Sequence, residues 1–377
     1  MEDFTAEQRE ILDAARRFNA AEAARFIDLM ESQNRFPPEL PRVLAQYGLM
    51  GMRFPREYGG SGLDAMGAAL AIEELARVSP AIADVILCLH AGTGLLLAYA
   101  NAEQKARFLP PVARGERLSA YGLTEREAGS DLAALRTVAQ PTSDGFALRG
   151  AKIFITLGAV ADFAVVLART NLDAEKPHRG MSLLLVEGHN RGKPQEFMGL
   201  RGTAVAGISF NNLVVPRQNI VGVENEGFKQ VMKSLDGGRI EVAALSVGLA
   251  QGALDEAVKY ARQRKQFGRR IADFQGIQFL LADMQTRIDA ARGLTYRAAC
   301  LRDAGRPHSR EASQAKLFAS EAALQCASDA LQIHGGYGYW KKFAVERLFR
   351  DAKITQIFEG TNQIQRIVIA RSVLEEG

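Results

Sequence analysis

Apolar positions recur at helical spacing through the first third of the chain. Thr5 and Gln8, three residues apart, form a capping box, and four apolar residues follow it at helical spacing (Ile11, Leu12, Ala15 and Phe18). Proline and clustered glycines predict a loop over 54–63. The helical pattern then resumes over 64–76 and again over 82–115. The first part of the chain, up to about residue 118, is therefore predicted to be helical.

The pattern changes between residues 119 and 222. Short runs rich in Val, Ile, Leu and Phe are separated by Gly, Pro, Asn and Asp, and they predict strands over 152–156, 163–168, 181–186 and 208–215. Asp144-Gly145, between β-prone runs, predicts a hairpin. Because no helix of about 10–15 residues separates these runs, the pattern favours an antiparallel sheet or barrel over βαβ units.

Long helical patterns return from about Gly227. One apolar stripe consists of Ile240, Ala243, Ala244, Val247, Ala250, Leu254, Val258 and Ala261. A second consists of Ile277, Leu281, Met284, Ile288 and Ala291. Helices of this length with short connections predict a bundle. The chain is thus expected to be an α+β protein, with helices before and after a β region.

Composition and charge narrow the classes of partner. Of the 377 residues, 47% are hydrophobic and 24% are charged, which is typical of a soluble globular chain. The net charge of +4 is small and unclustered, so it gives little support to a nucleic-acid partner. The three cysteines show no C-x-x-C spacing, which argues against a disulfide scaffold or a four-ligand zinc site and favours a reducing cytosol.

Two segments bear on localisation. The N-terminus is acidic and amphipathic where a signal peptide would be basic and then apolar, so a cytoplasmic protein is expected. The stretch 85–102 carries no formal charge and is long enough to suggest a membrane span. It also contains His90, Thr93 and Asn101, and this mixed composition favours a buried core helix. No membrane association is expected.

Several common motifs are absent. The sequence contains no P-loop, no H-E-x-x-H pair and no strand–G-x-G-x-x-G–helix unit, so the usual dinucleotide fingerprint is missing. The five histidines are scattered without an evident metal-ligand spacing, and no metal site is expected.

Two segments near the start of the β region carry groups suited to a planar ligand. In 121–131 (YGLTEREAGSD), Thr124, Ser130 and backbone amides occupy a Gly-containing turn, which suits the polar edge of a heterocycle or a phosphate, although an ordinary loop fits as well. In the KIFIT segment, alternation puts Phe154 and Thr156 on one face, where a ring and a hydroxyl could meet one ligand. Taken alone, an aromatic residue in a strand is more often part of the core.

A basic cluster closes the first long helix, at 262–270 (RQRKQFGRR). Cations at a helix C-terminus are favoured by the helix dipole, which accounts for part of the cluster. Arg264, followed by Gln266 and Phe267, could equally bind a pyrophosphate through bidentate hydrogen bonds.

The segment 357–365 (IFEGTNQIQ) carries a carboxylate in an apolar setting. Thr361 is suited to cap a last helix that runs to about Val373, which places Glu359 just before that helix on a glycine-containing turn. A carboxylate with apolar neighbours has its pKa raised by desolvation, which suits a general base near neutral pH. The alternative is a solvated turn residue.

These segments, in this order, resemble the acyl-CoA dehydrogenase family, and the likeness covers 1–377. Further segments carry it, namely MGLRGT (198–203), VVP (214–216), LDGGR (235–239), 248–268, 274–284, 330–339 and 350–361. The resemblance implies an N-terminal helical domain (1–118), a middle antiparallel β-barrel-like domain (119–222) and a C-terminal four-helix bundle (223–377). It also implies a homotetramer of the short- or medium-chain kind, with one FAD per subunit and a role in fatty acid metabolism.

The resemblance assigns residues to two binding sites. Thr124 would meet the flavin pyrimidine edge, Phe154 would pack on the flavin ring, and Thr156 would lie near N5. The full set implied for FAD is Tyr121, Leu123, Thr124, Ser130, Phe154, Thr156, Arg264, Gln266, Phe267, Gln275, Gln332, Gly335, Gly336, Thr361 and Gln363. Among them, Arg264, Gln266, Phe267, Gln332 and the Gly335-Gly336 turn would reach the FAD of a neighbouring subunit. The set implied for the substrate is Ser130, Asp236, Arg239 and Gly360.

Glu359 matches the catalytic base of the family. It would remove the α proton of an acyl-CoA while the β hydrogen leaves as hydride to flavin N5, which gives a trans-2-enoyl-CoA. Some members place the base on the helix near LDGGR, where this sequence has Gly238, and Glu241 stands off the matching position. An electron-transfer flavoprotein is the implied electron acceptor.

Three alternatives remain open from the sequence. The acyl group could be bound to a carrier protein instead of CoA, or the enzyme could be an oxygen-using relative. A non-catalytic, nucleic-acid-binding flavoprotein of the same fold is the alternative from a different class, and the mildly basic pI is its only support.

The sequence departs from the family pattern at several positions. Arg126 and Glu127 stand where Pro-Gly is common, Phe154 and Leu157 stand where Trp and Asn are common, and Gly207 replaces a frequent acidic residue. A core role is expected for His90, and contact with a polar or branched acyl substituent is its alternative.

Overall fold

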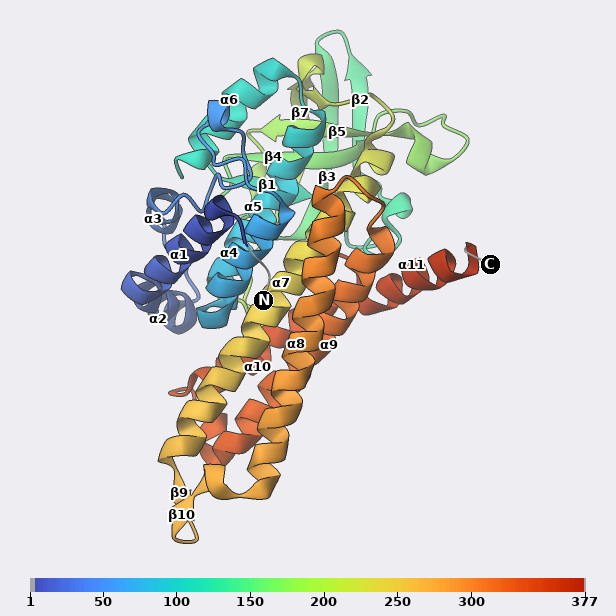
Figure 1. The fold of residues 1–377 in the computed structure, drawn as a ribbon. Helices are drawn as coiled ribbons and strands as arrows, with labels where there is room; N and C mark the ends of the chain where they lie inside the picture. Colours follow the sequence, from blue (N-terminus) through green and yellow to red (C-terminus); the bar gives the residue numbers. More distant parts are fainter. Residues whose placement is uncertain (1–3, 376–377) are drawn as a thin grey trace.

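The structure is a computed structural model that describes residues 4–375, and helices and strands are segregated along the chain (Figure 1). The first region is helical, with α1 Ala6–Ala21, α2 Ala23–Gln33, α3 Leu40–Gln46, η1 Arg56–Tyr58, α4 Ala65–Val78, α5 Pro80–Tyr99 and α6 Ala102–Ala113. The predicted capping box of α1 is confirmed, because the Thr5 hydroxyl accepts from the Gln8 amide and the Gln8 side chain accepts from the Thr5 amide. The loop predicted over 54–63 contains only the short η1.

The helix predicted over 82–115 is in fact two helices. Asn101 ends the apolar run and starts α6 with its own capping box to Gln104. By length and composition, α5 could cross a membrane, but most of it is buried inside the molecule. Its Gly92 lies against the backbone of Ala120 in the sheet. The prediction of a buried core helix at this position is confirmed.

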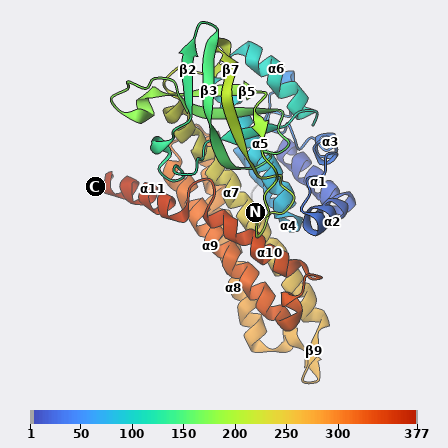
Figure 2. The same ribbon diagram turned by 180° about the vertical axis from the view of Figure 1, so that it is seen from behind.

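The middle region forms one sheet. Its elements are β1 Ser119–Gly122, η2 Leu132–Ala134, β2 Val138–Thr142, β3 Gly145–Ile155, β4 Phe163–Arg169, η3 Pro177–Gly180, β5 Met181–Glu187, β6 Asn190–Arg191, β7 Ala206–Pro216, η4 Arg217–Asn219 and β8 Ile220–Val221. The predicted hairpin is confirmed, since Thr142 pairs with Gly145 and β2 runs antiparallel to β3. Figure 2 shows β2, β3 and β7 side by side above the helices.

The expectation of an antiparallel barrel-like sheet is correct only in part. The strand order is β6-β7-β3-β2-β4-β5-β8, with β1 paired to β4, and among the described residues no pairing closes the two ends. Most neighbours are antiparallel, but β1 and β2 each pair with β4 in parallel. The sheet is therefore open and mixed, and it is not a closed barrel.

Alternation along β4 explains how this sheet is buried on both faces. Phe163, Val165 and Leu167 belong to a core shared with the helices. Ala164 and Val166 belong to a second core formed within the sheet itself. One face of the sheet thus supports the helices, which fixes the position of α5 relative to the strands.

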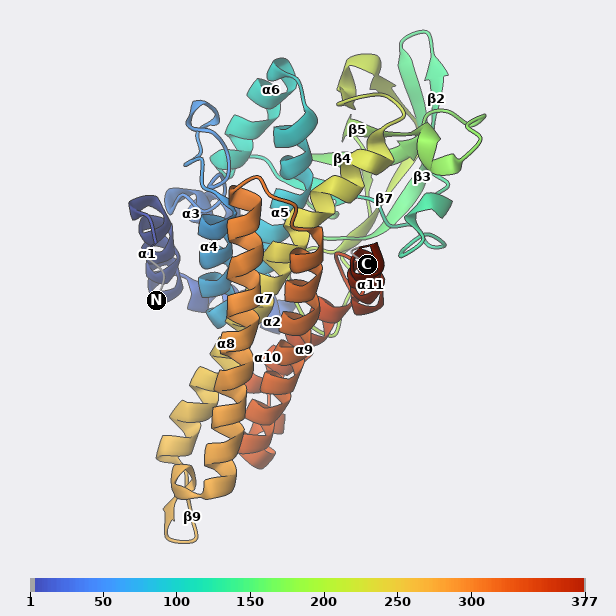
Figure 3. The same ribbon diagram turned by 45° about the vertical axis from the view of Figure 1, so that its right-hand side comes forward.

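The last region is a helical bundle that extends away from the sheet (Figure 3). Its elements are α7 Gly227–Gln263, β9 Lys265–Gln266, β10 Arg269–Arg270, η5 Ile271–Asp273, α8 Gln275–Asp303, α9 Ser309–His334, η6 Gly335–Tyr339, α10 Ala344–Ala352, η7 Lys353–Gln356 and α11 Asn362–Glu375. The small hairpin of β9 and β10 forms the tip, while α11 projects sideways near the sheet (Figure 1). Because α7 begins at Gly227, Gly238 lies well inside this helix and not at its start. The domain boundaries implied by the resemblance stay predictions.

Candidate functional site

A cavity of about 510 Å³ lies between α5, α7, the end of α8 and the turn that precedes α11. Its walls include Leu87 and His90 from α5, Gly238 and Glu241 from α7, and Glu359 from the turn. Exposed residues such as Lys233 and Arg306 stand at the cavity's edge, while Glu241 is only 3% exposed. The cavity therefore runs from solvent into the interior, and ionisable groups lie both at its exposed edge and in its buried inner wall.

Local backbone geometry sets the position of Glu359. The residue has a φ of 52°, and the following Gly360 has a φ of 90°, so the chain turns sharply between η7 and α11. The Thr361 hydroxyl accepts from the Ile364 amide and caps α11, which confirms the predicted cap. The Gln365 side chain donates to the Gly360 carbonyl and holds the turn from the other side.

Gly238 provides the room that Glu359 occupies. A Cβ built at Gly238 would lie 3.2 Å from the Glu359 Oε2 atom, which is tighter than an ordinary contact. The glycine that replaces the alternative base position therefore lets the Glu359 carboxylate lie against α7. Glu359 is half-buried in the wall of the cavity and does not project into bulk solvent from the turn.

The surroundings of Glu359 shift its titration toward neutral pH. Burial raises the pKa of Glu359 to about 7, and the nearby Glu241 carboxylate raises it further, whereas the charges of Lys316 and Arg239 lower it. Such a carboxyl is substantially ionised at neutral pH yet remains basic enough to accept a proton. The arrangement suits a general base.

Lys316 is a buried cation next to this turn. It is fully buried in α9, and its Nζ donates to the Asn362 Oδ1 at 3.0 Å. The Ser320 hydroxyl also donates to the same oxygen, at 3.1 Å. Burial lowers the pKa of Lys316 to about 7, and the charge of Glu359 opposes that shift. Sequence analysis missed Lys316, although a lysine within the apolar face formed by Ala312, Ala315 and Ala319 was a usable signal.

Glu241 belongs to a buried ionic cluster in the same cavity. Its Oε1 accepts from the Arg53 Nη1 at 2.6 Å, and its Oε2 lies 3.2 Å from the His90 Nδ1. Although burial alone would raise the pKa of Glu241, His90 and Arg53 outweigh it and lower the pKa to about 2. His90 is buried as expected, yet it also lines the cavity, and its Nε2 is buried without a hydrogen-bond partner.

The residues implied for the flavin edge gather on β1 and β3. The Thr124 carbonyl accepts from the Ile153 amide, and the Leu123 carbonyl accepts from the buried Lys152, which ties this segment to β3. Lys152 also forms a 2.8 Å ion pair with Glu125. Of the other implied residues, Tyr121 lines the cavity and has a buried hydroxyl without a partner, whereas Ser130 is exposed.

The core interpretation of Phe154 is wrong. Its side chain is 58% exposed, and its φ of 56° accompanies a shift of register between Lys152 and Ile155. The strand is therefore irregular at Phe154, and the side chain is not buried as strand aromatics usually are. The ring contacts Phe197 edge-on at 6.0 Å between centroids, and Thr156 lies within reach of the Cys88 thiol.

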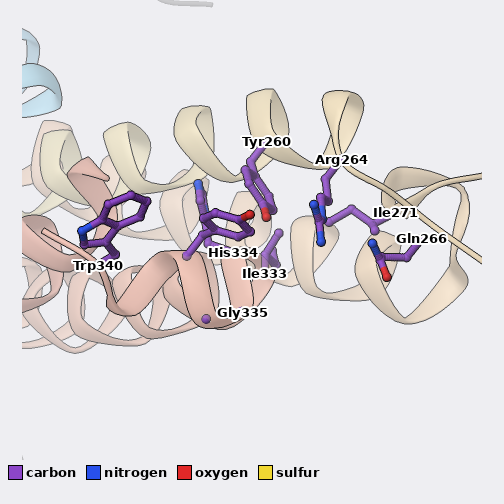
Figure 4. A pocket seen from close by; sticks show the side chains of 10 residues that line it. Tyr260, Arg264, Gln266, Ile271, Ile333, His334, Gly335 and Trp340 are labelled. Atoms are coloured by element: carbon purple, nitrogen blue, oxygen red, sulfur yellow. The ribbon is translucent and has the colours of Figure 1, made fainter. Parts of the chain in front are cut away.

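The second group of implied residues lies at the other end of the molecule. Arg264 and Gln266 line an open hollow of about 570 Å³ near the bundle tip, together with Gly335, Gly336 and Trp340 (Figure 4). The Tyr260 ring stacks on His334 there at 4.2 Å. From Gly238 to Arg264 along α7 is about 39 Å at 1.5 Å per residue. The structure therefore separates this group from Glu359 within one chain.

The remaining implied residues lie at helix ends or in the cavity wall. Gln275 starts α8, Gln332 lies in the last turn of α9, and Gln363 lies in the first turn of α11. Phe267 is 93% exposed in the tip hairpin. Asp236 lines the cavity and accepts from the buried Arg239 at 2.6 Å.

Residues 4–375 hold no cluster of His, Cys, Asp and Glu side chains that could bind a metal ion. Cys88, Cys300 and Cys326 are not in disulfides.

The chain is similar to characterised proteins along almost its whole length. Three family models match it, described as acyl-CoA dehydrogenase N-terminal domain (5–116), middle domain (120–213) and C-terminal domain (225–374). An acyl-CoA dehydrogenase of Bacillus subtilis is 45% identical over 98% of each chain. The caffeyl-CoA reductase–Etf complex subunit CarC of Acetobacterium woodii is 43% identical over 99% of this chain and 100% of its own.

A solved structure gives the same result in three dimensions. The butyryl-CoA dehydrogenase of Megasphaera elsdenii has a TM-score of 0.94 and 38% identity, and the match covers 99% of this chain and 100% of that one. The likeness therefore extends over the sheet, the cavity and the bundle.

Proposed function

The chain belongs to the acyl-CoA dehydrogenase family, and on that premise we propose that it oxidises the α,β carbon–carbon bond of an acyl-CoA with Glu359 as the base. It is an oxidoreductase. The single observation that carries the proposal is the Glu359 carboxylate in the cavity wall, with a pKa of about 7.

FAD is the cofactor of this chain. The residues present suit a flavin, because Phe154 leaves an apolar ring surface open beside the Thr156 hydroxyl and the Thr124 turn. In the proposed site Phe154 packs on the ring, and Thr124 and Thr156 bind its polar edge. When bound, FAD supplies the acceptor for the β hydrogen and its electron pair.

The proposed chemistry of the protein itself is proton transfer. A thioester entering the cavity from the exposed edge places its α carbon beside Glu359, opposite Gly238. The carboxylate removes the α proton, and the buried setting keeps water away from the developing charge. Lys316 and Arg239 favour the ionised base, while Glu241 opposes it. The exposed Lys233 and Arg306 at the cavity edge suit the phosphates of CoA.

Two partners follow from the same premise. The hollow at the bundle tip is open to solvent and about 39 Å from Gly238 along α7, too far to share a ligand with the cavity of the same chain. In the proposed homotetramer, the hollow would therefore bind part of the FAD of another subunit. An electron-transfer flavoprotein is the proposed electron acceptor, supported by the relative from Acetobacterium woodii, which is named as a subunit of an Etf complex.

The test is anaerobic mixing of the purified holoenzyme with a panel of acyl-CoAs and acyl-carrier proteins. Bleaching of the flavin absorbance by acyl-CoAs is the expected result. Bleaching by carrier-bound acyl groups alone would change the proposed substrate carrier. No bleaching by any member of the panel would contradict the proposed function.

A further inference from the structure

Several charged side chains line the inner part of the cavity, and Arg302 is one of them. Arg53, Glu241 and Arg302 all line it, and the two arginines act on each other as like charges. Glu241 is the one carboxylate of this group. Arg53 and Glu241 form a 2.6 Å ion pair in which Arg302 takes no part.

Glu241 does not serve as the partner of Arg302. Its Oε1 accepts from Arg53 and its Oε2 is engaged by His90, so both oxygens already have partners. Within residues 4–375, the Arg302 guanidinium has no hydrogen bond and no ion pair at 4.0 Å or less.

The other acids near Arg302 are engaged elsewhere. The Asp303 carboxylate accepts from the backbone amides of Ala65 and Met66, where it caps α4. The Asp236 Oδ1 accepts from Arg239 and from the Ser309 hydroxyl. Burial, followed by the charge of Arg53, lowers the pKa of Arg302, whereas the charges of Glu241, Asp303 and Asp236 act against that shift without a direct contact. An arginine remains charged at neutral pH even so.

The helix opposite Arg302 is shaped to receive it. Any Cβ at Gly237 would collide with the Arg302 guanidinium, so the glycine leaves the space that the group occupies. Gly237 and Glu241 are four residues apart on α7 and therefore lie on one face. The guanidinium thus lies against the face of α7 that carries Glu241.

A partly buried guanidinium without a hydrogen-bonded anion is costly unless a ligand supplies one. We propose that Arg302 binds a carboxylate carried by the acyl group, so that the preferred substrates are ω-carboxyacyl thioesters. This inference rests on the proposed function, because it names the substrate class of the same cavity. Arg302 is then a specificity-determining residue that contacts the substrate, and Arg53 holds Glu241 away from that carboxylate.

The experiment compares matched acyl-CoAs that differ only in the terminal group. Valeryl-CoA is paired with glutaryl-CoA, and hexanoyl-CoA with adipyl-CoA. Dissociation constants are measured by calorimetry on the Glu359→Gln holoenzyme, in which no turnover consumes the ligand. A charge-assisted hydrogen bond in a partly buried site predicts at least about tenfold tighter binding of one carboxylated partner. Differences under about twofold in both pairs would overturn the inference.

Two further variants locate the effect. Adding Arg302→Met should abolish the preference for the carboxylated ligand and leave the unsubstituted acyl-CoA within about twofold. Arg297→Met is the matched control, because Arg297 lies on the same helix but outside the cavity lining, where it pairs with Glu311. An equal loss for both ligands in Arg302→Met would mean that Arg302 binds the common CoA portion, which also contradicts the inference.

Failure of this inference is distinguishable from failure of the proposed function. If wild-type flavin is bleached by valeryl-CoA and the two ligands of each pair bind equally, the dehydrogenase proposal stands and the role of Arg302 falls. Thermal unfolding of each variant checks the fold. Among residues 4–375, no other group loses a hydrogen bond when Arg302 is removed, so Arg302→Met should fold like the parent protein. The ratio of the two dissociation constants in the parent protein is by itself enough to test the inference.

Discussion

The cavity around Glu359 and the hollow at the bundle tip differ in how far one chain completes them. In the cavity, the charged groups face each other at short range, as in the pair of Arg53 and Glu241. In the hollow, aromatic rings remain open to solvent, with Trp340 half exposed and Phe267 of the adjoining hairpin almost fully exposed. Large exposed aromatic side chains mark surfaces that bind something else. The proposed proton chemistry thus uses groups of one chain, whereas the exposed rings of the tip suit binding of a ligand or a second chain.

Among variants that test this comparison, Lys316→Met is expected to change kcat the most. The substitution removes a cation that favours the ionised base and a donor that holds Asn362. The pKa of Glu359 should therefore rise above about 7, and less of the base is ionised at neutral pH. We expect a loss of kcat on the order of 100-fold at pH 7.

The readout that distinguishes charge from structure is the pH profile. The acid limb of kcat should move to higher pH in Lys316→Met, and Lys316→Arg should restore part of the activity at pH 7. A loss of activity at every pH with an unmoved limb would show that Lys316 acts only in folding.

A smaller effect is expected at the tip from Arg264→Ala. Because a bidentate arginine contact to a phosphate contributes about 1.5–3 kcal/mol, retention of FAD should weaken by about tenfold or more. Equilibrium dialysis of the apoprotein with FAD measures the loss of affinity, and sedimentation shows whether the oligomer is kept. The pH profile of the remaining holoenzyme should not change, since the tip is remote from Glu359. A shifted profile would break the separation of the two regions.

The smallest effect is expected from Glu241→Gln. Glu241 raises the pKa of Glu359, so its removal should lower that pKa and move the acid limb of kcat to lower pH. The change in kcat at pH 7 should be no more than about twofold, because a base with a pKa of about 7 is already about half ionised there. The direction is opposite to that of Lys316→Met, and the two variants therefore check each other. An acid limb that moves upward in Glu241→Gln would contradict the electrostatic account of the cavity.

Local sequence patterns predicted the elements that carry the base. Thr361 as a cap required only the neighbouring residues, because helix capping acts over a few residues. The hairpin at Asp144-Gly145 was predictable for the same reason. These features depend little on the rest of the fold.

Features that depend on distant contacts were not predictable. Glu241 was set aside because it does not stand at the position of Gly238, although three residues along a helix put both on one face. Its partner Arg53 is far away in sequence, and only the fold brings the two together. The core alternative for Phe154 was wrong for a different reason, since aromatic residues in regular strands are usually buried and the irregularity between Lys152 and Ile155 has no local signature.

The central claim is that the Glu359 carboxylate removes the α proton, and Glu359→Gln tests it most directly. The variant keeps the size of the side chain but cannot accept the proton, so it should bind FAD as the wild type does. In an anaerobic stopped-flow experiment with a substrate acyl-CoA, its flavin reduction should be slower on the order of 1000-fold or more. Flavin reduction at the wild-type rate in Glu359→Gln would contradict the account.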